Sequence, residues 1–469
     1  MKQYFEKSLT KRLVEGGVWA FSAKAGSGFL TIALTALVTR MLPPQEIGLF
    51  FLSFSIIAMV SLFARFGLDQ LGIKLIGGGL VANDLVSVKL LTLRILKLVG
   101  GLTILWTVVT ALSFDYFSVR ILDEYNISRV FKMLFSVWLI VTTIQILFSE
   151  IFRSFQRIGY ASLFAGGTAF GGFGAGLLAG IVILPLYFLQ VELTVEILLS
   201  IIIAATSIFL IVELILIVRM LQFKGKSSEA SNTVCGAGYK ELLGQGFYFF
   251  CINLSIFSLV HADTIILGFY RPAEEVAIYA ATTRIVKLVT MSLIVVYEVV
   301  APVVVELNAG NRKKQLQRVL RLAATAAAIP TSLVLIVFIF KSQEVLGFLY
   351  GDYYREGAKI LVILSVGQLV NVWSGLSSYT LSITGYHKVN MYLVSFIASA
   401  SIICCLVFVE EYGASAVAWI ISLAWIIQNV LAVLLTRYLA GVWTPAGLLF
   451  SINELRRYLL KKNSDPTAT

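Results

Sequence analysis

Charged side chains are scarce in this sequence. They make up 13% of its 469 residues, whereas hydrophobic residues make up 58%. A soluble domain carries about 25% charged residues because its surface faces water. The charges here are too few to cover a globule of this size, so the composition indicates that lipid surrounds much of the chain. The net charge of +11 does not indicate nucleic-acid binding, because the basic residues favour alternate loops between apolar runs, as membrane topology demands.

The side chains of enzymatic and metal chemistry are also few. There are only two histidines, His261 and His387, and the four cysteines form neither a metal-binding nor a disulfide pattern. The sequence contains no Walker-type glycine-rich loop ending in Lys-Ser/Thr. It therefore predicts a protein that is not an enzyme and holds no metal or cofactor. Energy for its work must come from an ion gradient of H⁺ or Na⁺, from the substrate gradient, or from downstream removal of product.

The apolar residues gather in runs that suit membrane-spanning helices. About 20 residues at about 1.5 Å per residue cross the ~30 Å of hydrocarbon, and few of the runs alternate as barrel strands do. Helices satisfy their own backbone hydrogen bonds and can face lipid alone. The sequence thus predicts an all-α polytopic membrane protein of about twelve transmembrane helices, over residues 16–39, 46–68, 90–113, 128–150, 161–187, 195–218, 243–268, 274–304, 318–340, 357–382, 389–409 and 413–437.

The loops between these spans differ in charge. If the N-terminus is cytoplasmic, the cytoplasmic segments hold most of the lysines and arginines, and the opposite loops hold more acids. The positive-inside rule favours this orientation. An even number of spans then places both termini in the cytoplasm, as expected of a multi-pass protein of the bacterial inner membrane.

The chain repeats itself at a fixed offset. Pro43 recurs as Pro272, Lys89 as Arg318 and Asp123 as Asp352, each 229 residues later. Six spans separate the copies, so both copies share one orientation in the membrane. This is the pattern of a parallel repeat, and it predicts two six-helix bundles around a central cavity.

The repeat divides the chain into four segments. We expect an N-terminal lobe over residues 1–220, a cytoplasmic linker over 221–239, a C-terminal lobe over 240–438 and a cytoplasmic tail over 439–469. In the tail, residues 448–460 are typical of an amphipathic helix on the membrane surface. Seven glycines crowd the fifth span, where they favour close helix packing or, alternatively, a flexible gate.

Two segments resemble a known family. Residues 39–50, TRMLPPQEIGLF, resemble the first hairpin of bacterial polysaccharide flippases, and residues 261–268, HADTIILG, followed by VAIY at 276–279, resemble the start of their second half. The family is the oligosaccharide and O-antigen flippase group of the multidrug/oligosaccharidyl-lipid/polysaccharide (MOP) superfamily. Ala277 departs from it, because the family often has glycine there.

The resemblance implies a function. Such proteins move a lipid-linked oligosaccharide, usually on undecaprenyl pyrophosphate, from the cytoplasmic to the periplasmic leaflet by alternating access around a central cavity. The substrate would be an O-antigen or a capsular or exopolysaccharide repeat unit. The partners implied are membrane lipids, and a polysaccharide polymerase and chain-length proteins.

Cationic residues inside the predicted spans are candidates for binding the pyrophosphate. Arg284 and Lys287 lie three residues apart in the eighth span, near mid-membrane, where a charge costs roughly 2.5–3.5 kcal/mol unless it faces a cavity or a partner. Arginine suits bidentate phosphate contacts. The alternative is a structural ion pair with an acid such as Asp263. Lys24 in the first span faces the same cavity or snorkels to the cytoplasmic surface.

Other polar residues suggest gating and ion coupling. Arg65 and Asp69, four residues apart, form either a cavity or gate contact or a local salt bridge. Asp263 and Glu298 are candidates for coupling, because a carboxylate in a desolvated site can bind a proton or pair with Na⁺. The alternative for Asp263 is a fixed partner to a basic residue. Glu150 is expected to pair with Arg153.

A polar stripe on the tenth span suits sugar recognition. Its members are Gln368, Asn371, Ser374 and Ser378, with Trp373 adjacent. Hydroxyl and amide groups beside an aromatic ring match the hydroxyls and C–H faces of sugars. The same stripe can instead hydrogen-bond neighbouring helices.

Two other functions compete with the flippase. A multidrug/cation antiporter of the same superfamily would need buried acids, whereas pyrophosphate needs cations. Arg284, Lys287 and Lys24, against few central acids, favour the flippase. A membrane-embedded glycosyltransferase or polymerase predicts large periplasmic loops, and the loops here are short.

Overall fold

The computed structural model describes residues 9–81, 84–121, 128–165, 168–222, 238–310 and 312–447. These residues form helices and connecting turns, with no strand among them. Seven of their helical segments are long and apolar enough to cross a membrane, or eight if the bent pair Tyr239–Ser258 and Val260–Tyr270 counts as one span. The predicted all-α membrane fold is confirmed. Each of the twelve predicted spans is helical over most of its length, although not every one passes this measure alone.

The chain divides into two compact units. The first contains the residues up to Ala281 together with Leu346–Tyr354 and Ile402–Val417, and the second contains the remainder. The predicted lobe boundaries stay predictions. Most of the expected linker and the expected amphipathic helix at 448–460 lie outside the described residues.

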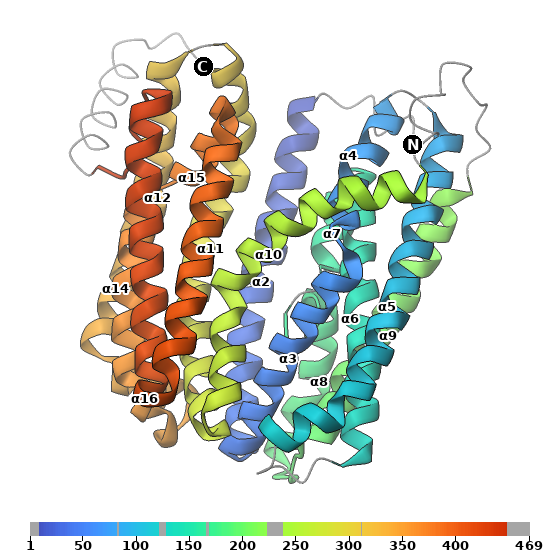
Figure 1. Ribbon diagram of the computed structural model, residues 1–469, viewed down its shortest axis with the longest axis vertical. Helices are drawn as coiled ribbons and strands as arrows, with labels where there is room; N and C mark the ends of the chain where they lie inside the picture. Colours follow the sequence, from blue (N-terminus) through green and yellow to red (C-terminus); the bar gives the residue numbers. More distant parts are fainter. Residues whose placement is uncertain are drawn as a thin grey trace. The chain divides into compact units, whose positions relative to one another are not determined.

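The first unit is a helical bundle. Its helices are α2 (Leu9–Met41), α3 (Pro44–Arg65), α4 (Leu68–Val81), α5 (Leu85–Ile121), α6 (Arg129–Ser154), α7 (Ile158–Leu163), α8 (Phe173–Phe188), α9 (Val195–Leu221) and α10 (Tyr239–Tyr270). Helix α6 packs against α9 and α3, and α10 packs against α3, α4 and α5. In Figure 1, α10 runs obliquely across this bundle.

Local sequence sets the helix starts in this bundle. Pro44 occupies the first turn of α3, where its missing N–H costs nothing. Ser128 caps α6, since its Oγ accepts a bond from Phe131 N at 3.0 Å. The same hydroxyl donates to Glu196 Oε1 at 3.0 Å in the first turn of α9. The starts of α6 and α9 therefore lie together, and the two helices run parallel and in register.

The fifth predicted span, 161–187, is wrong as one continuous helix. The structure breaks it into α7 and α8, separated by residues 164–172. Gly171 has φ +78°, a conformation that glycine adopts without strain. A Cβ at Gly172 would lie 2.7 Å from Ala165 O, and one at Gly174 would overlap the ring of Phe209. The glycines thus serve close packing, as one of the two interpretations predicted, and they also accommodate a break.

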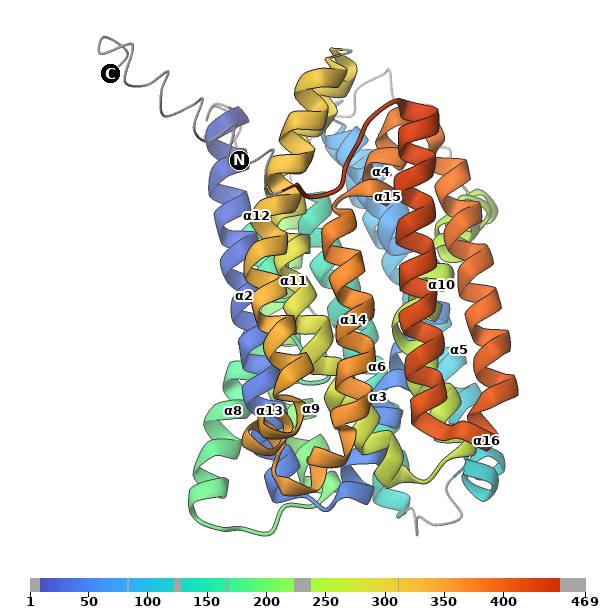
Figure 2. The same cartoon turned by 90° about the vertical axis from the view of Figure 1, so that its left-hand side faces the viewer.

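The elements after α10 are α11 (Ala273–Ala309), α12 (Lys313–Phe340), α13 (Ser342–Tyr350), η1 (Asp352–Gly357), α14 (Ala358–Ser374), α15 (Ser377–Leu381), η2 (Ser382–Tyr386), α16 (His387–Leu435) and η3 (Thr436–Ala440). In the second unit, α12 and α14 pack side by side (Figure 2). Gly413, with φ 59°, divides α16 into two limbs. This break falls where the sequence places the boundary between the spans 389–409 and 413–437.

Equivalent acids of the repeat perform the same structural task. Glu46, near the start of α3, accepts a hydrogen bond from Val195 N, the first residue of α9, at 2.6 Å. Glu275, 229 residues later near the start of α11, accepts one from Ala414 N at 2.6 Å, where the second limb of α16 begins. Each acid therefore caps the start of the helix that forms the sixth predicted span of its own half. These contacts support the internal repeat found in the sequence.

Candidate functional site

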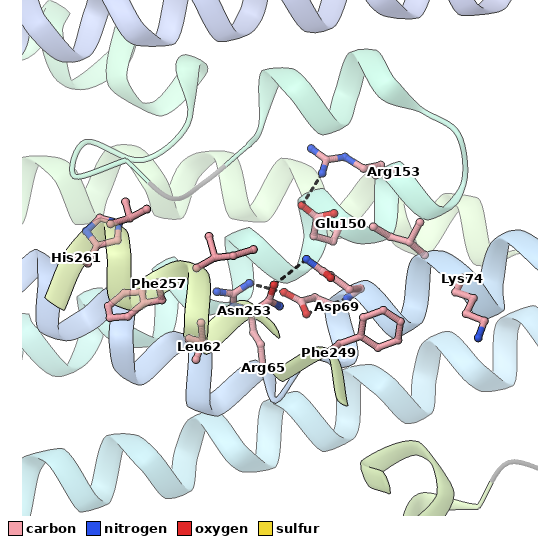
Figure 3. Close-up of a pocket in the computed structure, with 14 residues that line it drawn as sticks. Leu62, Arg65, Asp69, Lys74, Glu150, Arg153, Phe249, Asn253, Phe257 and His261 are labelled. Carbon is pink, nitrogen blue, oxygen red and sulfur yellow. Dashed lines mark hydrogen bonds and ion pairs between the residues drawn. The ribbon is translucent and has the colours of Figure 1, made fainter. Parts of the chain in front are cut away.

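A polar cavity of about 660 Å³ opens within the first unit (Figure 3). Its walls come from α3, α4, α6 and α10. The apolar part of the lining includes Leu62, Phe249 and Phe257. The polar part consists of Arg65, Asp69, Gln70, Lys74, Glu150, Arg153, Asn253 and His261.

A tight turn between α3 and α4 places the first ion pair. Phe66 has φ 48° and Gly67 has φ +70°, so the helix is interrupted between Arg65, the last residue of α3, and Asp69, in the first turn of α4. A Cβ at Gly67 would overlap Gly246 O and lie 2.6 Å from Phe250 N. Glycine is therefore required for the backbone of α10 to approach this turn.

Arg65 and Asp69 form the salt bridge that their spacing predicted. Arg65 Nη1 contacts Asp69 Oδ2, and the two side chains are only 16% and 4% exposed. Arg65 Nε also donates to Ser61 O at 3.3 Å, and Asp69 Oδ1 accepts from Gln70 N at 2.9 Å. These additional bonds fix the guanidinium at the cavity wall, so Arg65 belongs both to a local pair and to the cavity.

A second ion pair lies on α6. Arg153 Nη1 lies 3.1 Å from Glu150 Oε1, as expected from the sequence. With Lys74, the lining then carries three cationic side chains and two carboxylates, and both carboxylates are already paired with arginine. The cavity therefore has an excess of positive charge before His261 is considered. An arrangement of this kind favours an anionic polar group over a cationic one.

Helix α10 supplies the neutral side of the cavity. Asn253 Oδ1 accepts a hydrogen bond from Gln70 Nε2 at 3.0 Å. His261 stacks on Phe257 with ring centroids 5.1 Å apart. Amide groups and aromatic rings beside cations can hold hydroxyl-rich groups next to an anion, because each kind of surface on such a ligand finds a matching partner.

Four other residues predicted as site residues belong to helices α2 and α11. Arg284 and Lys287 are half-buried on α11 in the second unit and do not line this cavity. Lys24 belongs to α2 and Glu298 to α11, but their side chains lie outside the described residues. The roles predicted for these four residues stay predictions.

Asp263 is buried on α10, with 1% of its surface exposed. It accepts hydrogen bonds from Tyr279 Oη at 2.9 Å and from Thr264 N at 2.7 Å. A tyrosine hydroxyl and a backbone N–H are thus among the donors to its carboxylate. Its predicted coupling role stays a prediction.

The polar stripe on α14 makes hydrogen bonds within the second unit. Asn371 Nδ2 donates to Gln368 Oε1 at 2.8 Å, and Ser374 Oγ donates back to its own helix. Trp373 Nε1 donates to Ser332 Oγ on α12 at 2.9 Å. Of these three bonds, the one from Trp373 reaches a neighbouring helix, and the other two stay within α14. Trp373 and Ser374 also line a largely apolar cavity of about 440 Å³, and sugar contact there stays a prediction.

The sequence did not single out three of the polar residues now in view. Gln70 and Asn253 are 183 residues apart and meet only because α10 folds back onto α4. Glu213 in α9 is fully buried. A signal for Glu213 was present, because it is the sole charged residue in the apolar run 197–218.

The fold and the cavity define the class of protein, a multi-pass helical membrane transporter. The sequence matches the polysaccharide biosynthesis protein family over residues 13–308, more than half of the chain. The chain therefore belongs to that family, as its two motif segments predicted. No curated protein matches the sequence.

Solved structures show that this fold is the one of the MOP superfamily. An inward-facing multidrug resistance transporter of the MATE family matches with a TM-score of 0.65 at 14% identity, covering 90% of this chain and 97% of that one. A MOP superfamily transporter from Pyrococcus furiosus, described as having a binding pocket of reverse polarity, gives 0.58 at 12% identity, with 91% and 95% covered. The lipid II flippase MurJ, inward closed, gives 0.55 at 14% identity, with 91% and 92% covered.

Proposed function

We propose that this transporter flips an undecaprenyl-pyrophosphate-linked oligosaccharide from the cytoplasmic to the periplasmic leaflet. The observation that carries the proposal is the positive excess of the cavity in the first unit, where both carboxylates among the described lining residues are paired with arginine. A pyrophosphate moving through a helical bundle needs such cations, since an unpaired buried charge is costly. Membership of the polysaccharide biosynthesis family supports the same substrate class.

The orientation predicted from loop charge indicates which side of the membrane this cavity faces during transport. With both termini in the cytoplasm, the C-terminal ends of α3 and α6 lie on the cytoplasmic side, and the cavity opens where the lipid-linked substrate is made. We expect Arg284 and Lys287 on α11 to contact the headgroup as well, as the sequence predicted. The inner membrane is the proposed location, and a polymerase and chain-length proteins are the proposed partners on the periplasmic side.

A complementation assay tests the proposal. A strain lacking the gene should accumulate the lipid-linked oligosaccharide in the cytoplasmic leaflet, and the wild-type gene should restore surface polysaccharide. Arg65→Ala removes charge-assisted hydrogen bonds worth about 1.5–3 kcal/mol. The apparent affinity for the lipid-linked substrate should fall by about 10- to 150-fold, and complementation should be lost. Arg284→Ala should also abolish complementation. Both variants must reach normal protein levels for the comparison to count.

A matched control is available at Lys341, whose side chain is 66% exposed in a pair with Glu344. Lys341→Ala should complement fully. The alternative function, export of cationic drugs, makes the opposite prediction in proteoliposomes. Uptake of a cationic dye without movement of a fluorescent undecaprenyl-pyrophosphate glycan would overturn the flippase proposal, as would unchanged surface polysaccharide in the deletion strain.

A further inference from the structure

Four acids are buried in the described part of the chain, and three of them have evident partners. Asp69 pairs with Arg65, Asp84 accepts from Ser87 N at 3.1 Å near the start of α5, and Asp263 accepts from Tyr279 Oη. The fourth is Glu213, which is 0% exposed. Among the described residues, neither of its carboxyl oxygens makes a hydrogen bond.

Glu213 lies in the membrane-spanning helix α9, eight residues or ~12 Å before its end. Its neighbour is Gln145 on α6. Gln145 is 1% exposed, and both polar atoms of its amide also lack a hydrogen-bond partner among the described residues. The offset between the two residues, 68 positions, equals that between Ser128 and Glu196 at the starts of the same helices. The parallel packing of α6 and α9 therefore brings the carboxyl and the amide to one level.

Among the described residues, the helices that pack most extensively against α9 bring no cation to this level. They are α6, α8 and α3. Helix α8 carries no Asp, Glu, Lys, Arg or His. On α6 the charged residues after Gln145 are Glu150 and Arg153, which pair with each other at the cavity of Figure 3. On α3, Glu46 caps the opposite end of α9, and Arg65 pairs with Asp69.

The break in the fifth span lies beside this pair. A Cβ built on Gly171 would lie 3.6 Å from Gln145 Oε1 and 2.5 Å from Thr206 Cγ2 on α9. The backbone at the break is left-handed, with φ +78°. The amide that neighbours the carboxyl of Glu213 thus adjoins a point where a membrane helix is already interrupted. A change of charge there acts on an element that can rearrange without unwinding an intact helix.

We propose that Glu213 and Gln145 form a proton-binding site that couples transport to the proton gradient. A hydronium ion gives up one proton: its O–H bond breaks and leaves water, an O–H bond forms on a carboxylate oxygen of Glu213, and the charge of that side chain changes from −1 to 0. Release reverses the step. Gln145 serves both states, because its NH₂ donates to the carboxylate and its carbonyl oxygen accepts from the carboxyl O–H. The neutral form suits the closed, dry packing, and the charged form requires water to reach it.

The side chains at this level suit a proton better than a metal ion. A hard cation such as Na⁺ needs several oxygen ligands, whereas the side chains here supply one carboxyl and one amide. A proton needs a single oxygen. The site differs from the coupling candidates Asp263 and Glu298, and it does not depend on which substrate the transporter carries.

Infrared difference spectroscopy on the purified full-length protein, after a pH jump in H₂O and in D₂O, tests the protonation directly. The wild type should show the C=O stretch of a titrating carboxylic acid, shifted in D₂O, and Glu213→Gln should lose this band. The matched control is Glu196→Gln, a change on the same helix at the partly exposed acid bonded to Ser128, which should keep the band. A band that survives in Glu213→Gln but disappears in Asp263→Asn would overturn the proposal.

The second test measures movement of the fluorescent undecaprenyl-pyrophosphate glycan in proteoliposomes with an imposed pH gradient. The gradient should accelerate the wild type several-fold and leave Glu213→Gln at its gradient-free rate. Gln145→Leu should shift the pH dependence without removing the infrared band. Acceleration by a Na⁺ gradient and none by a pH gradient would overturn the proton assignment. Because the infrared readout needs no substrate, failure of the flippase proposal would leave this test intact.

Discussion

The acids that cap the sixth span of each half give a prediction with a magnitude. Glu46→Ala removes the acceptor for Val195 N, and Glu275→Ala removes the acceptor for Ala414 N. Loss of a helix cap costs about 0.5–2 kcal/mol, and loss of a negative charge at a helix N-terminus costs about 0.3–1 kcal/mol. We therefore expect each variant to lower the free energy of unfolding by about 1–3 kcal/mol.

Glu275→Ala should be the more costly of the two changes. Glu275 Oε2 also pairs with Arg271 Nε at 2.7 Å, with the side chains 26% and 33% exposed. A partly exposed ion pair adds about 0.2–1 kcal/mol. Glu46→Gln and Glu275→Gln retain an acceptor oxygen and lose only the charge, so each should cost roughly 0.3–1 kcal/mol.

Equilibrium unfolding of the detergent-solubilised protein, followed by tryptophan fluorescence in an SDS titration, measures these differences. Glu344→Ala is the control, because Glu344 sits in an exposed pair with Lys341 and a surface change of this kind stays within about ±0.5 kcal/mol. If Glu275→Ala is no more destabilising than Glu344→Ala, the reasoning that the repeated acids hold the helix starts is refuted.

Three further predictions concern single sites. Gly67→Ala should lower the free energy of unfolding by about 2–4 kcal/mol in the same titration, because the φ of Gly67 is +70° and a Cβ would overlap α10. The control is Gly100→Ala on α5, where a Cβ meets open space. This change should be neutral or slightly stabilising. Trp373→Phe should cost about 1 kcal/mol through loss of the bond to Ser332, and Ser332→Ala in that background should add little. The hydrogen bond from Lys341 is the largest of several causes that hold the pKa of Glu344 below its ordinary value. A small stabilisation is therefore present above that ordinary pKa and is lost as the pH falls through the lowered pKa. Lys341→Gln should reduce this pH dependence in the same titration repeated across pH.

The membrane helices followed from the sequence because their signal is one-dimensional. An apolar run long enough to cross the bilayer needs no knowledge of its neighbours. The same holds for Arg65 with Asp69 and for Glu150 with Arg153, since partners three or four residues apart on adjoining turns meet whatever surrounds them. Both pairs were expected and both are present.

The break in the fifth span and the bond between Gln70 and Asn253 could not be deduced in this way. Glycine in an apolar run is compatible with a continuous helix and with an interruption, and the choice depends on the close approach of Phe164, Thr206 and Phe209 to the glycine backbone. Gln70 and Asn253 meet because of how α10 crosses the bundle. Both features depend on contacts between segments distant in the chain, and the sequence pattern of a single segment carries no information about such contacts.

Glu213 shows why polar residues in membrane helices are hard to rank from sequence. Asp263 attracted attention because it lies in a segment that resembles a family motif, and a tyrosine hydroxyl and a backbone N–H donate to it. Glu213 stands in no motif, yet it is fully buried, and neither of its carboxyl oxygens makes a hydrogen bond among the described residues. What distinguishes such residues is the chemistry of the neighbouring helices. The parallel register of α6 and α9 therefore decides that an amide, and not a cation, faces Glu213.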